Sequence, residues 1–289
     1  MSVVASAVVR TAATVGDSRL SFLQAGKGPV VVALHGIPTG AELWRDLAGL
    51  LADAGYRVVA PDLPGYGQTR VPSSGDFSLA GAAATVARWL DEAALAPAWV
   101  VGHDAGGAVG QIMAAKHPGS VSRLTLTNSI VDGAWPAPRA RFATLTARLG
   151  LYRPAARLRM VPNAFMRWQV RRAVAEPERV DDRALDRVVW DTKWTDRAGR
   201  AAFERHLAAL TPRDTATIVP TLRRLRVPCQ IVWGMKDPFQ RWAKAGIRLR
   251  ELLPSPAVHA LEGCGHFTPL ECPRELLDAM LGWQRRGGA

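Results

Sequence analysis

The sequence predicts an α/β fold, namely a mostly parallel eight-stranded sheet with helices on both faces and an inserted helical cap. Three observations predict it. Apolar β-like runs alternate with amphipathic helical patterns through the first 130 or so residues. From residue 132 to residue 227 the β-like runs stop, and helical stretches broken by prolines take their place. The alternation resumes at Cys229. We therefore expect a core made of residues 1–131 and 228–289, with a cap at 132–227.

The elements before the insertion follow from periodicity. Six β-like runs are expected, at Val8–Val15, Arg19–Gln24, Val30–Leu34, Tyr56–Pro61, Ala98–Gly102 and Arg123–Ile130. Three helical patterns lie between them, at Glu42–Ala54, Leu79–Ala94 and Gly107–Lys116. In parallel sheets of this kind the functional site lies at the carboxyl ends of the strands. The loops that follow these runs are thus the places to search for chemistry.

One such loop carries an acid at a tight turn. Residues 100 to 110 read VVGHDAGGAVG, a β-like run that passes directly into a helical pattern with Asp104 at the turn. A strand-to-helix turn of this type needs small residues two before and two after its central residue, and Gly102 and Gly106 meet that need. A carboxylate is ionised at neutral pH without a base, and its natural target is a saturated electrophilic carbon. The pattern predicts Asp104 as a nucleophile, although an acid at such a turn also suits a helix N-cap.

Two further loops supply an acid and a histidine. QIVWGMKDP presents Asp237 after a short apolar run, and ALEGCGHFT presents His266, in the chain order nucleophile, acid, histidine. Asp132, after the sixth β-like run, is a rival for the acid, but the Gly-x-x-Asp loop favours Asp237. A lone Gly-His-Phe also suits a surface turn. The combination in this order favours a catalytic set.

The loop after Val30–Leu34 reads HGIPTG and is expected to complete the site. Its Ile37 backbone N–H would lie opposite that of Ala105, and two such donors form an oxyanion hole. His35, Gly36 and His103 flank the site, and we interpret the two histidines as structural, with rings bonded to loop backbone.

Composition narrows the class of protein. Cys229, Cys264 and Cys272 have no metal-ligand spacing, and no disulfide framework, metal or cofactor is expected. No apolar run approaches the roughly 20 residues of a membrane span, and the amino terminus lacks a signal-like pattern, so we expect a cytoplasmic protein. The expected partner is a small-molecule substrate, and a homodimer is left open.

The formal net charge of +12 is concentrated in the insertion. Residues 134–226 hold 20 Lys and Arg against 9 Asp and Glu, which leaves the rest of the chain nearly neutral. Such a surface suits an anionic substrate, membrane or partner, but arginines within helical patterns favour solvated helix faces. Aromatic platforms and groove-reading motifs of nucleic-acid binders are lacking. We expect neither a nucleic acid nor a membrane as partner.

Aromatic side chains of the insertion are candidates for contact with a substrate or leaving group. They comprise one tyrosine, Tyr152, and four tryptophans, Trp135, Trp168, Trp190 and Trp194. Each alone is more often part of a core, but a cap above the turn at Asp104 would place at least one tryptophan against the pocket.

The segments HGIPTGAELW, DLPGYGQT, GHDAGG, WGMKDPF and GCGHFTPLE together resemble the epoxide hydrolase and haloalkane dehalogenase branch of the α/β-hydrolase superfamily. The resemblance covers nearly the whole chain outside the insertion. It implies that Asp104 attacks carbon to form an alkyl-enzyme ester, that His266 activates the water that hydrolyses it, and that Asp237 orients His266. The backbone N–H groups of Ile37 and Ala105 would then stabilise the oxyanion.

Departures from the family patterns discriminate between activities. Haloalkane dehalogenases commonly carry a tryptophan after the nucleophile and an asparagine in the His-Gly-x-Pro loop, and this chain has Ala105 and Ile37 there. Fluoroacetate-type dehalogenases hold the substrate carboxylate with arginines after the nucleophile, for which Ala105 and Ala108 offer no substitute. Epoxide hydrolases usually protonate the opening ring oxygen with two tyrosines of the cap, and this cap has one tyrosine. The resemblance favours epoxide hydrolysis of a hydrophobic or aromatic substrate over dehalogenation, another tailoring hydrolysis of a bulky metabolite, or a non-catalytic ligand-binding relative.

Overall fold

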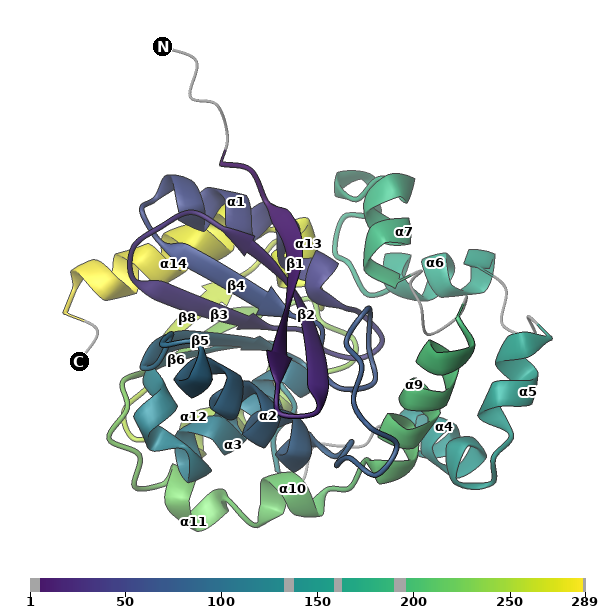
Figure 1. Cartoon of the computed structure of the whole chain (residues 1–289). Coiled ribbons are helices and arrows are strands. Elements are labelled where there is room, and N and C mark those ends of the chain that lie inside the picture. The colour runs from purple at the N-terminus through teal and green to yellow at the C-terminus, as the bar shows by residue number, and fades with distance from the viewer. Residues whose placement is uncertain (1–5, 133–137, 159–162, 190–195, 288–289) are drawn as a thin grey trace.

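The computed structural model describes residues 6–132, 138–158, 163–189 and 196–287. Its centre is one eight-stranded sheet in the order β1-β2-β4-β3-β5-β6-β7-β8 (Figure 1). The strands are β1 (Val9–Val15), β2 (Ser18–Ala25), β3 (Val30–Leu34), β4 (Arg57–Pro61), β5 (Ala98–His103), β6 (Val121–Thr127), β7 (Cys229–Gly234) and β8 (Ala257–Leu261). The pairs β1–β2 and β2–β4 are antiparallel and all others parallel, which confirms the predicted sheet.

The central strands are buried on both faces. Every residue of β5 and of β7 is buried, as expected for parallel strands covered on each side. Leu34 pairs with Gly102, and His103 with Thr127, so the carboxyl ends of β3, β5 and β6 lie level with one another. The loops that leave these ends therefore meet at one edge of the sheet.

Helices cover the two faces as two separate hydrophobic cores. On one face lie α2 (Leu79–Glu92), α3 (Ala105–Lys116) and α12 (Ile247–Leu252), and on the other lie α1 (Arg45–Asp53), α13 (Thr268–Glu271) and α14 (Pro273–Arg285) (Figure 1). Single turns at Ala41–Trp44, Pro118–Ser120 and Trp242–Gly246 connect these elements. Trp89 and Trp233 are fully buried in the first core, and Trp44 in the second.

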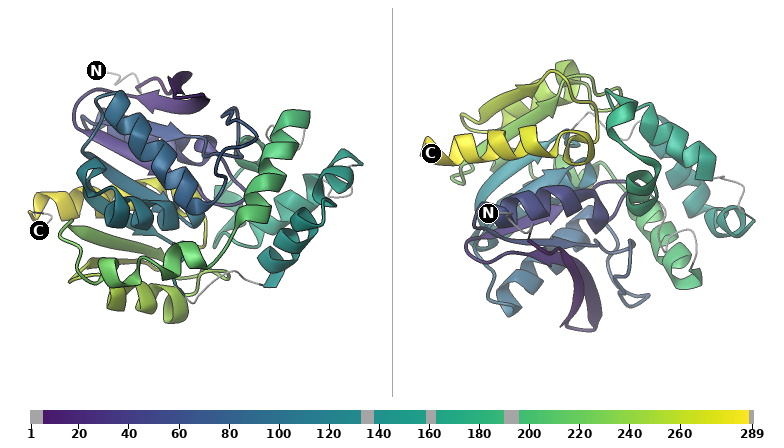
Figure 2. Two further views of the ribbon diagram at one scale, coloured as in Figure 1. Left: turned by 60° about the horizontal axis from the view of Figure 1, so that its bottom comes forward. Right: turned by 90° about the horizontal axis from the view of Figure 1, so that it is seen from above.

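The described helices of the insertion lie between β6 and β7. They are α4 (Pro138–Arg148), α5 (Tyr152–Arg157), α6 (Asn163–Arg171), α7 (Asp182–Val189), α9 (Arg197–Ala209), α10 (Arg213–Ala216) and α11 (Val219–Leu222), with a short turn at Pro177–Arg179. Figure 2 shows from two directions that α4 to α9 stand to one side of the sheet. By contrast, α10 and α11 pack against α3 of the core. The limits of the cap at residues 132 and 227 remain a prediction.

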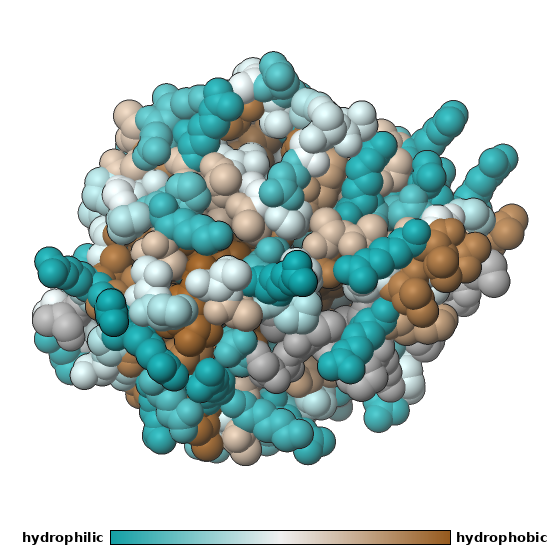
Figure 3. Space-filling view, turned by 90° about the horizontal axis from the view of Figure 1, so that it is seen from below, coloured by the Kyte–Doolittle hydropathy of each residue, from teal (hydrophilic) through white to brown (hydrophobic). Residues whose placement is uncertain are grey.

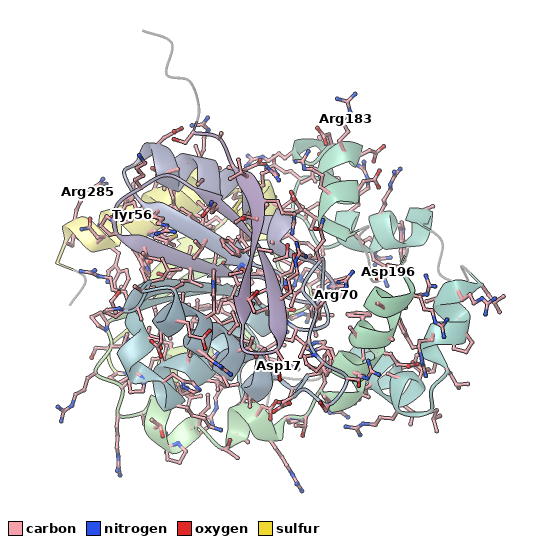
Figure 4. The ribbon with its side chains drawn as sticks, in the orientation of Figure 1. Asp17, Tyr56, Arg70, Arg183, Asp196 and Arg285 are labelled. Carbon is pink, nitrogen blue, oxygen red and sulfur yellow. A yellow bond between two sulfur atoms is a disulfide. The ribbon has the colours of Figure 1, made fainter. Side chains whose placement is uncertain are left out.

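Contacts between polar side chains join the insertion to the core. Arg70, in the loop after β4, forms a 3.1 Å ion pair with Asp196, which also caps α9 by accepting from the Gly199 N–H (Figure 4). The carboxylate of Asp214 accepts the backbone N–H of Leu79, at the start of α2. The start of α9 and the segment after it are thereby held against the core.

Most element boundaries differ from the predicted ones by one to three residues, and three examples follow. β6 ends at Thr127 rather than at Ile130, because Asn128 has a φ of 43° and leaves the extended conformation. The helix after β5 begins at Ala105, two residues before the predicted start. The helix expected at Glu42–Ala54 begins as a 3₁₀ turn, and its α-helical part spans Arg45–Asp53.

The cysteines require a correction. No disulfide framework was expected, yet Cys264 and Cys272 form a disulfide, with their Cα atoms 6.3 Å apart. The turn between β8 and α14 brings the two residues together, and linear spacing did not show this. Cys229 is buried as a free thiol. Within the described ranges, no helix is long and apolar enough to cross a membrane, and no cluster of side chains has the makeup of a metal site.

Candidate active site

Asp104 stands at the tip of the turn between β5 and α3. Its backbone has φ 49° and ψ −118°, a region that residues with a Cβ rarely adopt. The turn is stabilised by its own carbonyl oxygen, which accepts the N–H groups of Gly107 and Ile130 at 3.0 and 3.1 Å. Strained backbone of this kind persists where the surrounding structure enforces it, and it is typical of functional sites. The predicted nucleophile is thus held in a fixed direction.

Space around this turn admits only glycine at the flanking positions. A Cβ on Gly102 would lie 2.5 Å from the carbonyl oxygen of Gly106, and one on Gly106 would lie 2.1 Å from that of Leu34. Both distances are far inside van der Waals contact with rigid backbone. Gly36 is equally confined, since a Cβ there would lie 2.5 Å from the Asp104 side chain. The loop after β3 therefore approaches the carboxylate directly.

Backbone donors bind the carboxylate of Asp104. Its Oδ2 accepts the Ile37 N–H at 2.9 Å, and a hydrogen bond from the Ala105 N–H also favours the charged form. The structure thereby brings together the two donors that the sequence predicts. With Oδ2 held in this way, Oδ1 is the oxygen available for attack, and Oδ2 would become the carbonyl oxygen of an ester.

Asp237 and His266 form a buried pair. Nδ1 of His266 donates to Oδ2 of Asp237 at 2.8 Å, and both side chains are almost completely buried. The other oxygen, Oδ1, accepts the backbone N–H groups of Phe239 and Gln240 at 2.6 and 2.9 Å. These bonds fix the carboxylate, which fixes the imidazole ring. With Nδ1 as the donor, Nε2 is left to accept a proton.

Asn128 is a site residue that the sequence analysis missed. It follows β6 directly, and its Nδ2 donates to Oδ2 of Asp237 at 2.7 Å while its Oδ1 accepts the Gly234 N–H at 2.9 Å. Asn128 thus holds the start of the loop that carries Asp237. A polar residue directly after a central strand was the available signal, but its role depends on a neighbour 109 residues away.

Burial and neighbouring charges shift the pKa values of the three ionisable groups at the site. Burial lowers the pKa of His266, but the charge and hydrogen bond of Asp237, with a further contribution from Asp104, outweigh it and leave the pKa above 6.5. Burial raises the pKa of Asp237, yet the charge and hydrogen bond of His266 and the bond from Asn128 leave it below its ordinary value. Burial raises the pKa of Asp104 above its ordinary value, opposed by the charge of His266 and by the Ile37 and Ala105 N–H groups.

The other histidines of these loops are bonded to backbone. Nε2 of His103 donates to the carbonyl oxygen of His266 at 2.8 Å, and burial lowers the pKa of His103 to about 3, so its ring is neutral. His35 is fully buried, and its Nε2 accepts the Leu63 N–H at 3.0 Å. His103 holds the loop that carries His266, and His35 joins the loops that follow β3 and β4.

Backbone of the insertion also touches the loop that carries His266. The His266 N–H donates to the carbonyl oxygen of Ala173 at 2.7 Å, and the Ala175 N–H donates to Oε2 of Glu271 at 2.7 Å. Glu271 is buried in α13, and burial raises its pKa above the ordinary value, against the N–H groups of Ala175, Gly265 and Phe267 that favour its charged form. The sequence analysis gave Glu271 no role. Its side chain joins the segment after α6 to the catalytic loop.

The aromatic candidates of the insertion fall into two groups. Trp135, Trp190 and Trp194 lie outside the described residues. Trp168 is 46% exposed, with the Arg172 guanidinium 4.8 Å from its ring centre. Tyr152 is partly buried, and its ring packs edge-on against Phe203 at 5.3 Å.

Tyr152 is connected to the site by a series of ring contacts. The Phe203 ring packs on Tyr66 at 5.2 Å, and Tyr66 packs on His35 at 4.7 Å, next to the loop whose Ile37 binds Asp104.

Asp132, the rival candidate for the acid that orients His266, forms a 3.1 Å ion pair with Arg248. The described contacts of His266 thus involve Asp237 and not Asp132.

Taken together, the geometry supplies a fixed carboxylate that accepts backbone N–H groups from Ile37 and Ala105, and a histidine whose Nε2 is left to accept a proton. Such a set can attack an electrophilic centre with Asp104 and then activate water with His266. Asp104 itself is 6% exposed, so a small surface of the nucleophile is accessible.

Comparisons with known proteins agree with this geometry. The family model for the alpha/beta hydrolase fold matches residues 29–273. A haloalkane dehalogenase of Mycobacterium marinum is 30% identical over 279 residues, covering 92% of this chain and 89% of the relative. A 2-hydroxy-6-oxononadienedioate/2-hydroxy-6-oxononatrienedioate hydrolase of Pseudomonas putida is 30% identical over 263 residues, covering 88% and 87%. Among solved structures, epoxide hydrolase CorEH without ligand superposes with a TM-score of 0.80 at 22% identity, covering 97% of this chain and 99% of that one, which shows the shared fold.

Proposed function

The chain belongs to the α/β-hydrolase family, and from that premise we propose that it is an epoxide hydrolase that acts through an ester on Asp104. The observation that carries the proposal is the carboxylate at the strained turn, with Oδ2 bound by the Ile37 N–H. In family members that cleave esters a serine commonly occupies this turn. A carboxylate suits attack on an sp³ carbon instead.

The first half-reaction forms the ester. Oδ1 of Asp104 attacks one ring carbon of the epoxide, the C–O bond to that carbon breaks, and the ring oxygen takes a proton. The Ile37 N–H on Oδ2 favours the charge distribution of the ester carbonyl that forms. Tyr152 is the candidate proton donor among the described residues of the insertion. Its phenol hydroxyl has the chemistry for this role, and the rings of Phe203, Tyr66 and His35 lie between it and the loop that carries Ile37.

The second half-reaction releases the diol. Nε2 of His266 takes a proton from water, and the oxygen of that water attacks Cγ of Asp104. The oxyanion on Oδ2 faces the Ile37 and Ala105 donors, and collapse of the intermediate expels the diol alkoxide, which is protonated by His266. Asp237 stabilises the imidazolium throughout. No cofactor takes part in this scheme, and the substrate is a small hydrophobic or aromatic epoxide.

Haloalkane dehalogenation is the second candidate, because relatives with that name are 30% identical. A leaving halide needs N–H donors in a water-poor site, where an unpaired anion costs several kcal/mol. Side chains at positions 37 and 105 are apolar here, so a dehalogenase would need a donor from the insertion. This absence favours the epoxide, whose oxygen stays attached to the intermediate. Other tailoring hydrolyses, and a ligand-binding role without catalysis, are further alternatives.

The experiment that tests the proposal traps the ester and weighs it. His266→Gln retains the nucleophile but lacks the base, so exposure to an aromatic epoxide should add the full mass of the epoxide to Asp104 within one turnover. A chloroalkane or bromoalkane would add the alkyl group alone, because the halide departs. Asp104→Asn with His266→Gln is the matched control and should gain no mass.

Steady-state assays complete the test. The wild-type protein should convert epoxides to diols and release halide from matched chloro- and bromoalkanes slowly or not at all. Halide release at a rate equal to diol formation would overturn the assignment in favour of dehalogenation. Normal turnover by the His266→Gln variant would exclude the two-step scheme. Absence of both adduct and product across the panel would leave a ligand-binding role as the better account.

A further inference from the structure

A group of apolar side chains on α4 and on the turns before and after α5 is exposed. The described residues expose nine large apolar side chains, and five of them lie within one stretch of 17 residues, from 142 to 158. Their exposed fractions range from 54% to 71%, the five highest of the nine. They are Phe142, Leu145, Leu149, Leu151 and Leu158. We call these five residues the α4–α5 patch.

The spacing explains how α4 comes to present them. Phe142 and Leu145 are three residues apart on one face of α4, and Leu149, directly after the end of the helix, continues the same spacing. The opposite face carries Thr144 and Ala147, which are buried where α4 packs on α9. The helix therefore has two apolar faces, of which only one is covered by the rest of the described chain.

The charged side chains in the segment that carries the patch are all positive. From residue 133 to residue 175 the chain has nine arginines and no aspartate, glutamate or lysine. Arg148 donates to the backbone carbonyl oxygens of Ala208 and Leu210, neutral acceptors that leave its charge in place. Arg157 is exposed on α5, whereas Arg153 pairs with Glu204. Arg148 and Arg157 thus bring positive charge to the patch, whereas Arg167 and Arg171, further along the chain, form ion pairs with Asp186 and Asp182.

The two helices lie where a partner can reach them. Figures 1 and 2 show α4 and α5 at the outer edge of the molecule, on the side away from the sheet. Figure 3 shows a hydrophobic area at this side of the molecule, with hydrophilic side chains projecting next to it. Side chains that project from an edge can reach an extended flat surface without collision by the rest of the fold.

We propose that the α4–α5 patch docks the protein on an anionic lipid surface. Interfacial helices combine these features, with leucine and phenylalanine inserted among the acyl chains and arginines beside the headgroups. A second copy of this chain fits less well, because a two-fold contact through the patch would place the same arginines against one another. This proposal departs from the sequence-based expectation of solvated arginines and no membrane partner, because the sequence does not reveal that the leucines beside the arginines are exposed.

The test measures binding of the full-length protein to vesicles by flotation. Vesicles of phosphatidylcholine with about a third phosphatidylglycerol should bind at least about tenfold more protein than phosphatidylcholine alone, and added salt should weaken the binding. Leu145→Ser with Leu149→Ser should lower binding by about tenfold or more. Val9→Ser with Val258→Ser removes two exposed apolar side chains elsewhere and should bind like the wild type.

Three results would overturn the proposal. They are equal binding to neutral and anionic vesicles, an equal loss in the control pair, and no binding at all. Sedimentation velocity separates the last case further, since a dimer abolished by the Leu145 and Leu149 changes would assign the patch to a second copy. If the double serine variant does not fold, Arg157→Glu tests the same surface by charge, and unchanged binding of that variant counts against the proposal. The readout involves no turnover and is independent of the proposed chemistry.

Discussion

Both oxygens of the Asp237 carboxylate have hydrogen-bond donors on them: His266 and Asn128 on Oδ2, and two backbone N–H groups on Oδ1. A carboxylate so fully bonded can hold only one orientation. An amide at this position would have to place an NH₂ group where donors already point. Replacing one carboxylate oxygen of Asp237 by an NH₂ group should therefore be enough to impair His266 as a base.

Asp237→Asn should lower kcat by about two to four orders of magnitude, because the imidazole loses the acceptor that fixes its tautomer and the charge that stabilises its protonated form. Asp132→Asn, the matched control, removes an ion pair with Arg248 that is partly exposed and should change kcat less than about threefold. Hydrolysis rates of an epoxide substrate compare the two. The reverse ranking would place the acid at the end of β6.

The same variant has a signature in the pH profile. The raised pKa of His266 means that the base is protonated, and inactive, until the pH exceeds a value above 6.5, so the acid limb of kcat should lie there. Because Asp237 is what holds that pKa up against burial, the residual activity of Asp237→Asn should have its acid limb at lower pH. A limb that does not move would mean that another group titrates.

Sequence motifs could reveal the residues whose local surroundings are diagnostic. Asp104 is flanked by glycines that a tight turn requires, and His266 lies in a turn-rich loop after a strand. Asn128 and Glu271 could not be found this way, since each acts through a partner about 100 residues distant in the chain. The Cys264–Cys272 disulfide was not predicted for a related reason, because it depends on how the loop between β8 and α14 turns.

Among the elements, α13 has a role beyond its four residues. Its Glu271 accepts the Ala175 N–H, and the carbonyl of nearby Ala173 accepts the His266 N–H, so two bonds run in parallel between the insertion and the catalytic loop. Burial raises the pKa of Glu271, so a neutral side chain with the same acceptor is a fair replacement. The element acts by positioning and does not contact the reacting atoms.

Glu271→Gln should keep kcat within about threefold of the wild type, because the amide oxygen still accepts the Ala175 N–H. Glu271→Leu has a similar volume but no acceptor, which leaves the partly buried Ala175 N–H without this partner, a cost of about 1 kcal/mol. We expect a drop of about tenfold in kcat and a matching loss of stability in guanidinium unfolding. If Gln is as damaging as Leu, the charge of Glu271 matters and the positioning role is wrong.

Strand and helix positions were predictable where burial enforces a clear period. Val30–Leu34 matches β3 at both ends, because a run of five apolar residues has no other place in an α/β fold. Predicted ends of strands and helices were wrong where the backbone leaves the regular conformation that the hydrophobic periodicity indicates. Asn128, with its positive φ, ends β6 inside the run that was predicted to extend to Ile130, and a preference for extended structure cannot show such a turn.

For the whole molecule, buried neutral histidines make stability depend on pH. His206 lies in α9, is 2% exposed, and donates through Nδ1 to the carbonyl oxygen of Phe77. Burial lowers the pKa of His206 to about 4, below the value of about 6.5 in an unfolded chain. Between these two values the unfolded state binds a proton that the folded state does not, so stability falls as the pH falls through this window.

His206→Gln retains a donor for Phe77 and removes the titration. From pH 7 to pH 5 it should lose less free energy of unfolding than the wild type, by about 1–2 kcal/mol. Guanidinium unfolding at the two pH values measures the difference, and the variant's own stability at pH 7 cancels in the comparison. Equal losses in both proteins would show that His206 is protonated, or accessible to protons, in the folded state.

The overall architecture was the most predictable level of all. The order of strands and helices in the chain determines a parallel sheet with helices on both faces, and eight strands in that arrangement are observed. What the order could not reveal is which parts of the insertion bind the core and which face outward. Patterns of period 3.6 identify helices, but α4 has apolar residues on two faces, and only tertiary packing selects the one that is covered.

The bond from His266 to the carbonyl of Ala173 bears on how such a protein can diversify. Segments that connect strands at the surface vary in sequence and tolerate insertions and deletions. A different insertion in this chain must place a carbonyl oxygen where that of Ala173 lies, because the His266 N–H otherwise loses its acceptor. Chimaeras with related insertions should therefore be joined so that residues 173 to 175 of this chain are kept, and substrate range is then altered through the remaining helices without displacing the base.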